Sequence, residues 1–261
     1  MSTTTLAAPI RVSTAGVHAR PGLGRLVAVE LRKILDTRAG FWLQVATVAL
    51  TALVVIVRLA VGGAADHTFA SVLTVGAMPA AVLLPVAGIL LVTSEWSQRT
   101  GIITFALVPA RSRVVGAKLV ASLVLAVAMH AVSVGIVAAG MLVASPGLDG
   151  TWSHVATLIA QSAVYLTAGM LVGVAFGMVV LASAPAIVAL FALPTAWMAV
   201  VSLSLFADVA PWLDPGRALD PMLREVLSTT QWAQAGTALA LWMLLPLLIG
   251  TWRITRRELT A

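Results

Sequence analysis

Six long apolar stretches follow one another along this chain, and they decide what it can fold into. Because an α-helix rises about 1.5 Å per residue and the hydrocarbon layer of a membrane is roughly 30 Å thick, one crossing takes about 20 mostly apolar residues. Only 10% of the residues are charged, whereas soluble domains hold about a quarter. The sequence therefore predicts an all-α membrane protein with six transmembrane helices, at residues 41–60, 71–93, 119–144, 154–181, 186–206 and 233–252.

The fourth and fifth stretches nearly merge, so the chain needs a break between them. Residues 154–206 would form a helix of roughly 80 Å, which is far too long for one crossing. Proline is tolerated at the first position of a new helix, and it pushes the residue before it out of helical geometry. We expect the turn at Ala182, Ser183, Ala184 and Pro185.

The distribution of lysine and arginine predicts which side of the membrane each end faces. All but three of the 16 basic residues fall in the amino-terminal region, in the connection between the second and third spans, or in the carboxy-terminal tail. These segments share one side of a six-span chain, and cytoplasmic segments carry an excess of Lys and Arg. Both termini are therefore predicted to be cytoplasmic. The other side keeps Arg58, Arg217 and Arg224.

Four regions follow from these spans. Residues 1–23 are expected to be a flexible cytoplasmic tail, because they lack an apolar core of signal-peptide length. Residues 24–40 form an amphipathic interfacial helix, 41–252 the six-helix transmembrane domain, and 253–261 a basic cytoplasmic tail.

The interfacial helix has one apolar and one charged side. Its apolar half holds Leu26, Val27, Leu31, Ile34 and Leu35, while Val29, Glu30 and Arg38 depart from the pattern. The basic residues of the segment are expected to face lipid phosphates or a partner protein, or to act only as an anchor for the first span. They are Arg25, Arg32, Lys33 and Arg38.

A charged segment separates the second and third spans. A polar entrance at Arg99, Thr100 and Gly101 leads into apolar positions, and Pro109 stops the helix before further basic residues. The pattern predicts a short amphipathic helix at the cytoplasmic mouth of two spans. Such a helix suits the groove of a soluble partner, and an inert loop on the membrane surface is the alternative.

On the opposite side, residues 207–232 hold a further helical segment. Asp220 is expected to cap it and Pro221 to occupy its first helical position. The apolar residues that follow fall on one face, so the segment is expected to lie on, or dip into, the outer leaflet. They are Met222, Leu223, Val226 and Leu227.

Motifs for catalysis and for nucleotide binding are missing from the sequence. No Gly-x-Ser elbow, His-Glu-x-x-His helix or phosphate-binding loop occurs, and the predicted spans contain no Asp or Glu for a proton relay. Cysteine is absent too. We expect no enzymatic activity, no metal and no nucleotide in this chain. Its basic residues flank apolar runs instead of forming a face for nucleic acid.

The spans also contain residues suited to packing, bending and hydrogen bonding. Gly169, Gly173 and Gly177 form a smooth ridge against which another helix can close, within the chain or in a second subunit. Prolines inside the second and fifth spans permit bends, at Pro79, Pro85 and Pro194. His130, Gln161 and Tyr165 are candidate substrate ligands or, as is commoner, hydrogen-bond partners between helices.

Taken together, these residues resemble the membrane subunits of type-2 ABC exporters, six-span bacterial permeases that pair with a separate ATPase. The resemblance covers nearly the whole chain from about Leu23 and is carried by VELRKILDTRAGFWL and SEWSQRTGIITFALVPARSRVVGAKLV. The family has an acidic residue at the end of the second span, then a turn, a short helix, a proline, a basic cluster and a lysine that opens the third span. Glu95, Arg99, Thr100, Gly101, Pro109, Arg111, Arg113 and Lys118 hold those places, with Thr-Gly in place of the commoner Gly-Thr.

The resemblance implies a permease subunit of the bacterial cytoplasmic membrane that works with two ATPase subunits and a second permease, identical or a paralogue. ATP and Mg would be held by the ATPase. The short cytoplasmic helix would be the coupling helix, through which ATP-driven closure switches a central cavity between inward and outward access. The coupling residues implied are Glu95, Gln98, Arg99, Thr100, Gly101, Ile102, Ile103, Phe105, Arg111 and Arg113.

The family lines its transport pathway mainly with the second and fifth spans. Here that implies Met78, Pro79, Leu83, Phe191, Pro194, Trp197 and Met198, to which His130 of the third span is added as a tentative pathway residue. Aromatic and methionine side chains suit a hydrophobic or amphipathic substrate. The alternatives are ordinary packing for each residue and, for the whole chain, an importer, a self-resistance permease or a scaffold that recruits a soluble protein.

Overall fold

The computed structural model describes residues 22–61, 63, 67–97, 111–144 and 152–256. Within these residues the chain is helical, without strands. Six of the helical segments are long and apolar enough to cross a membrane. This confirms the all-α class and the six expected spans.

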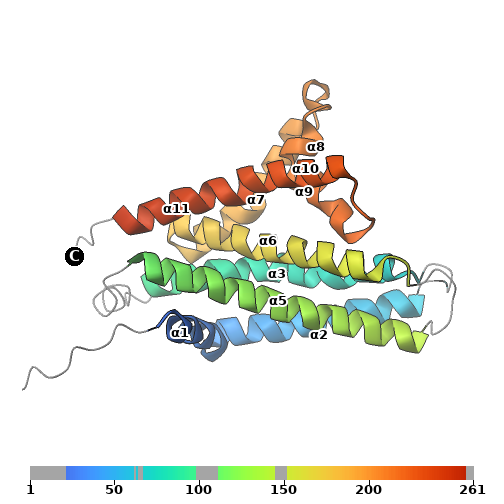
Figure 1. The fold of residues 1–261 in the computed structure, drawn as a ribbon, viewed down its shortest axis with the longest axis horizontal. Coiled ribbons are helices and arrows are strands. Elements are labelled where there is room, and N and C mark those ends of the chain that lie inside the picture. The colour runs from blue at the N-terminus through green and yellow to red at the C-terminus, as the bar shows by residue number, and fades with distance from the viewer. Residues whose placement is uncertain (1–21, 62, 64–66, 98–110, 145–151, 257–261) are drawn as a thin grey trace, which may run out of the picture.

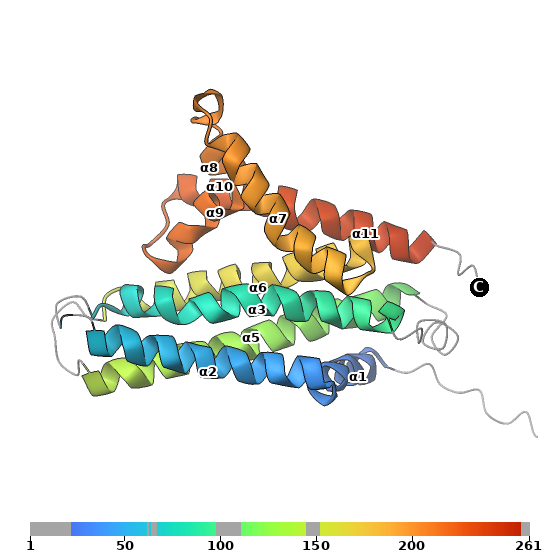
Figure 2. The same ribbon diagram turned by 180° about the vertical axis from the view of Figure 1, so that it is seen from behind.

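Four long helices form the main bundle. They are α2 (Arg38–Val61), α3 (Phe69–Ser97), α5 (Arg111–Ala144) and α6 (Val155–Val180), and they run alongside one another (Figures 1 and 2). The amphipathic helix α1 (Leu23–Asp36) lies at one end of this bundle. It ends at Asp36, and Arg38 is the first residue of α2 instead of part of the interfacial helix.

The last third of the chain forms a separate arm over α6. It begins with α7 (Ser183–Val201), which leaves the bundle at an angle, and ends with α10 (Thr229–Leu239), the π-helical segment η4 (Ala240–Leu244) and α11 (Leu245–Arg256) (Figure 2). Between them lie the short helices η2 (Ser204–Phe206), α8 (Ala210–Leu213), α9 (Pro215–Leu219) and η3 (Asp220–Leu223). Arg253 and Arg256 therefore belong to the last helix and not to the tail.

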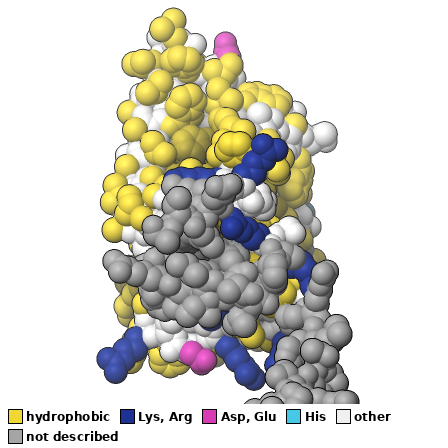
Figure 3. All heavy atoms as spheres, turned by 90° about the vertical axis from the view of Figure 1, so that its left-hand side faces the viewer, with side chains coloured by type: hydrophobic (Ala, Val, Ile, Leu, Met, Phe, Trp, Pro, Cys, Tyr) yellow, Lys and Arg dark blue, Asp and Glu magenta, His cyan; other side chains and the backbone are white. Residues whose placement is uncertain are grey.

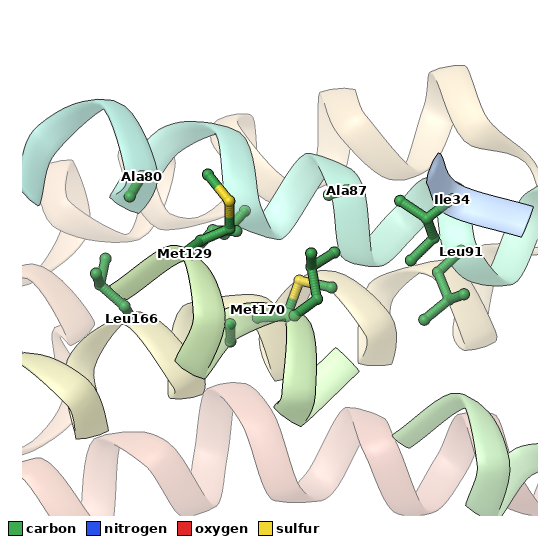
Figure 4. Close-up of a cluster of buried hydrophobic side chains, with 10 residues drawn as sticks. Ile34, Ala80, Ala87, Leu91, Met129, Leu166 and Met170 are labelled. Carbon is green, nitrogen blue, oxygen red and sulfur yellow. The ribbon is translucent and has the colours of Figure 1, made fainter. Parts of the chain in front are cut away.

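The bundle core lies where α3, α5 and α6 meet. Figure 4 shows Ala80, Ala87 and Leu91 of α3 facing Met129 of α5 and Met170 of α6, with Ile34 of α1 at one end. A Cβ added at Gly173 of α6 would overlap the carbonyl oxygen of Pro85 in α3. The backbones of the two helices are therefore in contact there. Gly169 and Gly177 also face α3. The glycine ridge thus packs within the chain.

The break between the fourth and fifth spans falls just before its expected place. Leu181 has a left-handed backbone, with φ 60°, and its N–H donates to the carbonyl of Gly177. Ala182 is extended and α7 begins at Ser183, so Pro185 lies in the first turn of α7 where no N–H is needed. The expected division is confirmed, while Ser183 and Pro185 belong to the new helix.

The π-helical segment adjoins Pro246. Proline in an α-helix clashes with the carbonyl four residues earlier, which here belongs to Trp242. In η4 the N–H of Leu245 instead donates to Ala240, five residues back. The wider turn accommodates the proline inside the sixth span.

The segment between the fifth and sixth spans, residues 207–232, differs from its expected form. Asp214, not Asp220, is the helix cap, because its side chain accepts from Gly216 N while Pro215 begins α9. Asp220 and Pro221 lie inside η3. Met222, Leu223 and Leu227 are buried against the protein, and Val226 is exposed. The apolar face thus packs on Tyr165 and Ala235 instead of facing the outer leaflet.

Candidate functional site

A buried ionic cluster joins α1, α3 and α5 at one end of the bundle. Lys33 Nζ lies 2.7 Å from Glu30 Oε1 and 2.5 Å from Glu95 Oε1. Lys118 Nζ lies 2.7 Å from Glu30 Oε2 and 3.3 Å from Glu95 Oε1. Among the described residues, two ammonium groups thus face two carboxylates.

The cluster is buried, unlike a surface salt bridge. Glu30, Glu95 and Lys118 are each 4% exposed, and Lys118 also donates to the carbonyl of Leu91 at 3.1 Å. Burial opposes the charged form of Lys33, but its hydrogen bonds to Glu30 and Glu95 outweigh that effect and hold the pKa of Lys33 above its ordinary value. Removing one partner of such a buried pair costs about 3–5 kcal/mol, because it leaves an uncompensated charge. Each charge in the cluster therefore depends on side chains from the other helices.

The turn between α1 and α2 directs one side of α1 toward the bundle. Thr37 Oγ1 donates to the carbonyl of Ile34 and accepts from Gly40 N. A Cβ at Gly40 would lie 2.0 Å from the Ile34 carbonyl, so the chain can make this turn only with glycine. The turn points Glu30 and Ile34 into the bundle, and both are buried.

A hollow opens beside the cluster. It has a volume of about 210 Å³ and lies between the α1–α2 turn, the end of α3 and the start of α7. Ile34 and Leu90 give it apolar walls, and Lys33, Ser94 and Ser183 give it polar ones. Ser183 is fixed by Thr93 of α3, whose hydroxyl lies 2.7 Å from its own.

The predicted coupling residues divide into two groups. Gln98, Arg99, Thr100, Gly101, Ile102, Ile103 and Phe105 lie outside the described residues. Glu95 is inside the ionic cluster, and Arg111 and Arg113 occupy the first turn of α5, where Arg111 donates to the carbonyl of Ile254 in α11. Glu95 and Arg111 thus lie in the helices on either side of residues 98–110, and both have partners within the described fold.

Among the interfacial residues, Arg25 and Arg32 are exposed, as expected for a cationic face, and Arg38 is exposed on α2. Lys33 is half-buried and points to the ionic cluster because two carboxylates lie within reach. Figure 3 views this end of the molecule and shows several lysine and arginine side chains there.

The structure does not gather the predicted pathway residues around the hollow. Met78, Phe191 and Met198 are 51%, 44% and 53% exposed. Leu83 and the prolines Pro79 and Pro194 are half-buried in their helices. Trp197 is half-buried and donates to the carbonyl of Leu213 at 3.0 Å. The later turns of α7 stand away from α3, which separates the two halves of the set (Figure 2).

The polar residues of the third and fourth spans join parts of the chain. His130 Nε2 of α5 lies 3.1 Å from the carbonyl oxygen of Ile159 in α6. This contact corresponds to the hydrogen bond between helices that was one of the two interpretations of His130. Gln161 donates to Glu225 O at 2.7 Å and to Met222 O at 3.3 Å, and accepts from Leu227 N at 3.0 Å. It fixes the segment between the fifth and sixth spans to α6.

Sequence reasoning missed Glu30 as a functional residue and gave Lys118 only a place at the start of a span. The signal was present, because Glu30 departs from the amphipathic pattern of its helix. An acidic residue on the apolar side of a helix needs a buried cation as its partner. Lys118 lies 88 residues away, so the sequence alone does not show the pairing.

Comparison with protein-family models gives no match for the chain, and comparison with curated proteins gives no significant match. The described residues thus have the fold expected of a multi-pass helical membrane protein, with a buried ionic cluster at one end.

Proposed function

We propose that the chain is the membrane permease subunit of an ATP-driven exporter of the type-2 ABC class, in the bacterial cytoplasmic membrane with both termini inside. The observation that carries this proposal is the ionic cluster. It ties α1, α3 and α5 together near the points where residues 98–110 leave α3 and enter α5.

The cluster suits the transmission of force from a soluble partner. An ATPase seated on residues 98–110 pushes on the end of α3 and the start of α5. Because separating the helices would leave buried charges without partners, which is unfavourable, the push moves α1, α3 and α5 as one body. Glu95, Arg111 and Arg113 hold the ends of that segment, and residues 98–105 contact the ATPase.

The substrate is hydrophobic or amphipathic and passes between the second and fifth spans. The hollow beside the ionic cluster has both apolar and hydroxyl side chains in its lining, which suits such a substrate, although the expected pathway residues do not line it. Two ATPase subunits hold ATP and Mg. A second permease completes the transporter, and the 17% burial of the fifth span leaves much of its surface open to such contact or to lipid.

The test is co-expression with a Walker-type ATPase encoded next to this chain. We expect the two proteins to purify together and candidate amphipathic substrates to stimulate ATP hydrolysis. A membrane scaffold would bind a partner without any stimulation by substrate, and transport against a gradient without an ATPase would overturn the proposal.

A charge reversal separates coupling from folding. Arg99→Glu should weaken ATPase association while membrane insertion stays intact. Arg217→Glu is the matched control, since Arg217 lies in the external segment, paired with Asp214. Normal transport by the Arg99→Glu variant would contradict the assignment of this segment to ATPase docking.

A further inference from the structure

A groove with an apolar wall and a basic end runs along α2 and α3, at the end of the bundle opposite α1. It consists of two adjoining hollows of about 610 Å³ and 520 Å³, which share Arg58 and Val75. Leu53, Val57 and Val61 form its wall on α2. They recur every four residues, so they lie on one side of the helix and extend about 12 Å along it.

Among the described residues that line these hollows, the charged ones are Arg58 and Arg224. Arg58 comes from α2, near the end of the first span. Arg224 follows η3 in the external segment, far away in the sequence. The fold therefore brings two guanidinium groups to one end of an apolar groove.

Hydrogen bonds fix Arg224 in this position. Thr74 of α3 donates to the carbonyl of Leu223 at 2.9 Å, and Gln161 holds the carbonyls on either side, at Met222 and Glu225. The guanidinium of Arg224 pairs with Asp220 at 2.9 Å, with both side chains about half exposed. A guanidinium has five N–H donors, so this pair leaves donors for another acceptor.

We propose that this groove binds an anionic phospholipid of the surrounding bilayer. Its phosphate lies between Arg58 and Arg224, which suit the bidentate geometry of a phosphate. One acyl chain follows Leu53, Val57 and Val61 along α2. Charge and shape both favour such an occupant, because the basic end lies at the end of the spans and the apolar wall extends into them.

The experiment measures lipid binding to the purified full chain in neutral detergent by native mass spectrometry. Dioleoyl phosphatidylglycerol should bind about tenfold more tightly than dioleoyl phosphatidylcholine, a difference typical of charge-assisted contacts. In the double variant Arg58→Gln/Arg224→Gln that preference should disappear. Arg217→Gln should keep it, since this exposed arginine of the same segment does not line the groove. Equal binding of the two lipids to the native chain would overturn the proposal.

Two further arms keep the inference testable if the double variant folds poorly. Val57→Glu places a negative charge on the exposed apolar wall and should abolish the preference, whereas Val188→Glu on the exposed face of α7 should not. Glycerol phosphate without acyl chains should compete weakly. Competition as strong as that of phosphatidylglycerol would show a site for free anions and rule out the lipid.

Discussion

The fourth span, in the bundle, and the fifth span, in the arm, have nearly the same apolar character and very different packing. The fourth span has a mean hydropathy of 2.1, and 50% of its most apolar 18 residues are buried. The fifth span has a mean hydropathy of 2.0, but only 17% of the corresponding residues are buried. The second span reaches 56%. Hydropathy therefore places a helix in the membrane but does not decide which helices it packs against.

Small residues account for the difference. Gly88 of α3 and Gly173 of α6 each leave room for the backbone of the other helix, which lets the two helices touch over a long distance. The sequence of α7 contains no glycine. Its first turns pack Ala186 and Leu190 against α3 and α6, and separate polar contacts join Trp197 to Leu213 and Ser183 to Thr93.

Lys118→Met tests the bundle most severely, because it leaves two buried carboxylates with one ammonium. We expect a loss of about 3–5 kcal/mol in the free energy of unfolding, measured by denaturant titration in detergent. The loss should shrink as the pH falls, since protonation neutralises the unpaired carboxylate. The control is Arg224→Met, whose exposed pair with Asp220 should contribute less than about 1 kcal/mol.

Gly173→Ala tests the close approach of α3 and α6. The added methyl group would meet the Pro85 carbonyl, which belongs to the backbone and cannot turn aside, so we expect a loss of about 3 kcal/mol. Gly236→Ala in α10 meets nothing within 4 Å and should stabilise slightly. Equal effects of the two substitutions in a thermal melt would show that backbone contact is not the cause.

Trp242→Phe tests the arm and should have the smallest effect. Trp242 and Trp197 both donate to the carbonyl of Leu213, at 2.9 Å and 3.0 Å. Because one donor remains after either substitution, each single variant should lose about 1 kcal/mol or less. The double variant leaves that carbonyl without either donor, and a double-mutant cycle should show a loss larger than the sum of the two. Simple additivity would contradict the shared carbonyl.

The six spans could be predicted because length and apolar content suffice to define a crossing. Their ends could not always be predicted, since α5 begins at Arg111, about two turns before the expected residue Leu119. At 34 residues it is about 51 Å long, so its charged first turns extend beyond the hydrocarbon while remaining helical. The basic residues at the start of α5 therefore do not mark the end of the helix.

The external cap shows a different limit. Asp214-Pro215 and Asp220-Pro221 carry the same local signal, and only the fold selects the first as a cap. The ionic cluster is similar, since the departure of Glu30 from its helical pattern indicates a buried partner without naming Lys118. Local sequence patterns predict that a residue caps a helix or has a charged partner. Long-range packing decides which residue is the cap or the partner.

The π-helical turn in the sixth span changes which side of that helix meets the rest of the protein. Ala238 and Gly250 are both buried and lie 12 positions apart. In an unbroken α-helix they would point about 120° apart, and one residue taken up by the wider turn reduces this to about 20°. The one extra residue in the wider turn rotates α11 relative to α10. The buried residues of the two helices then lie on one side of the span, whereas in an unbroken α-helix they would lie on two different sides.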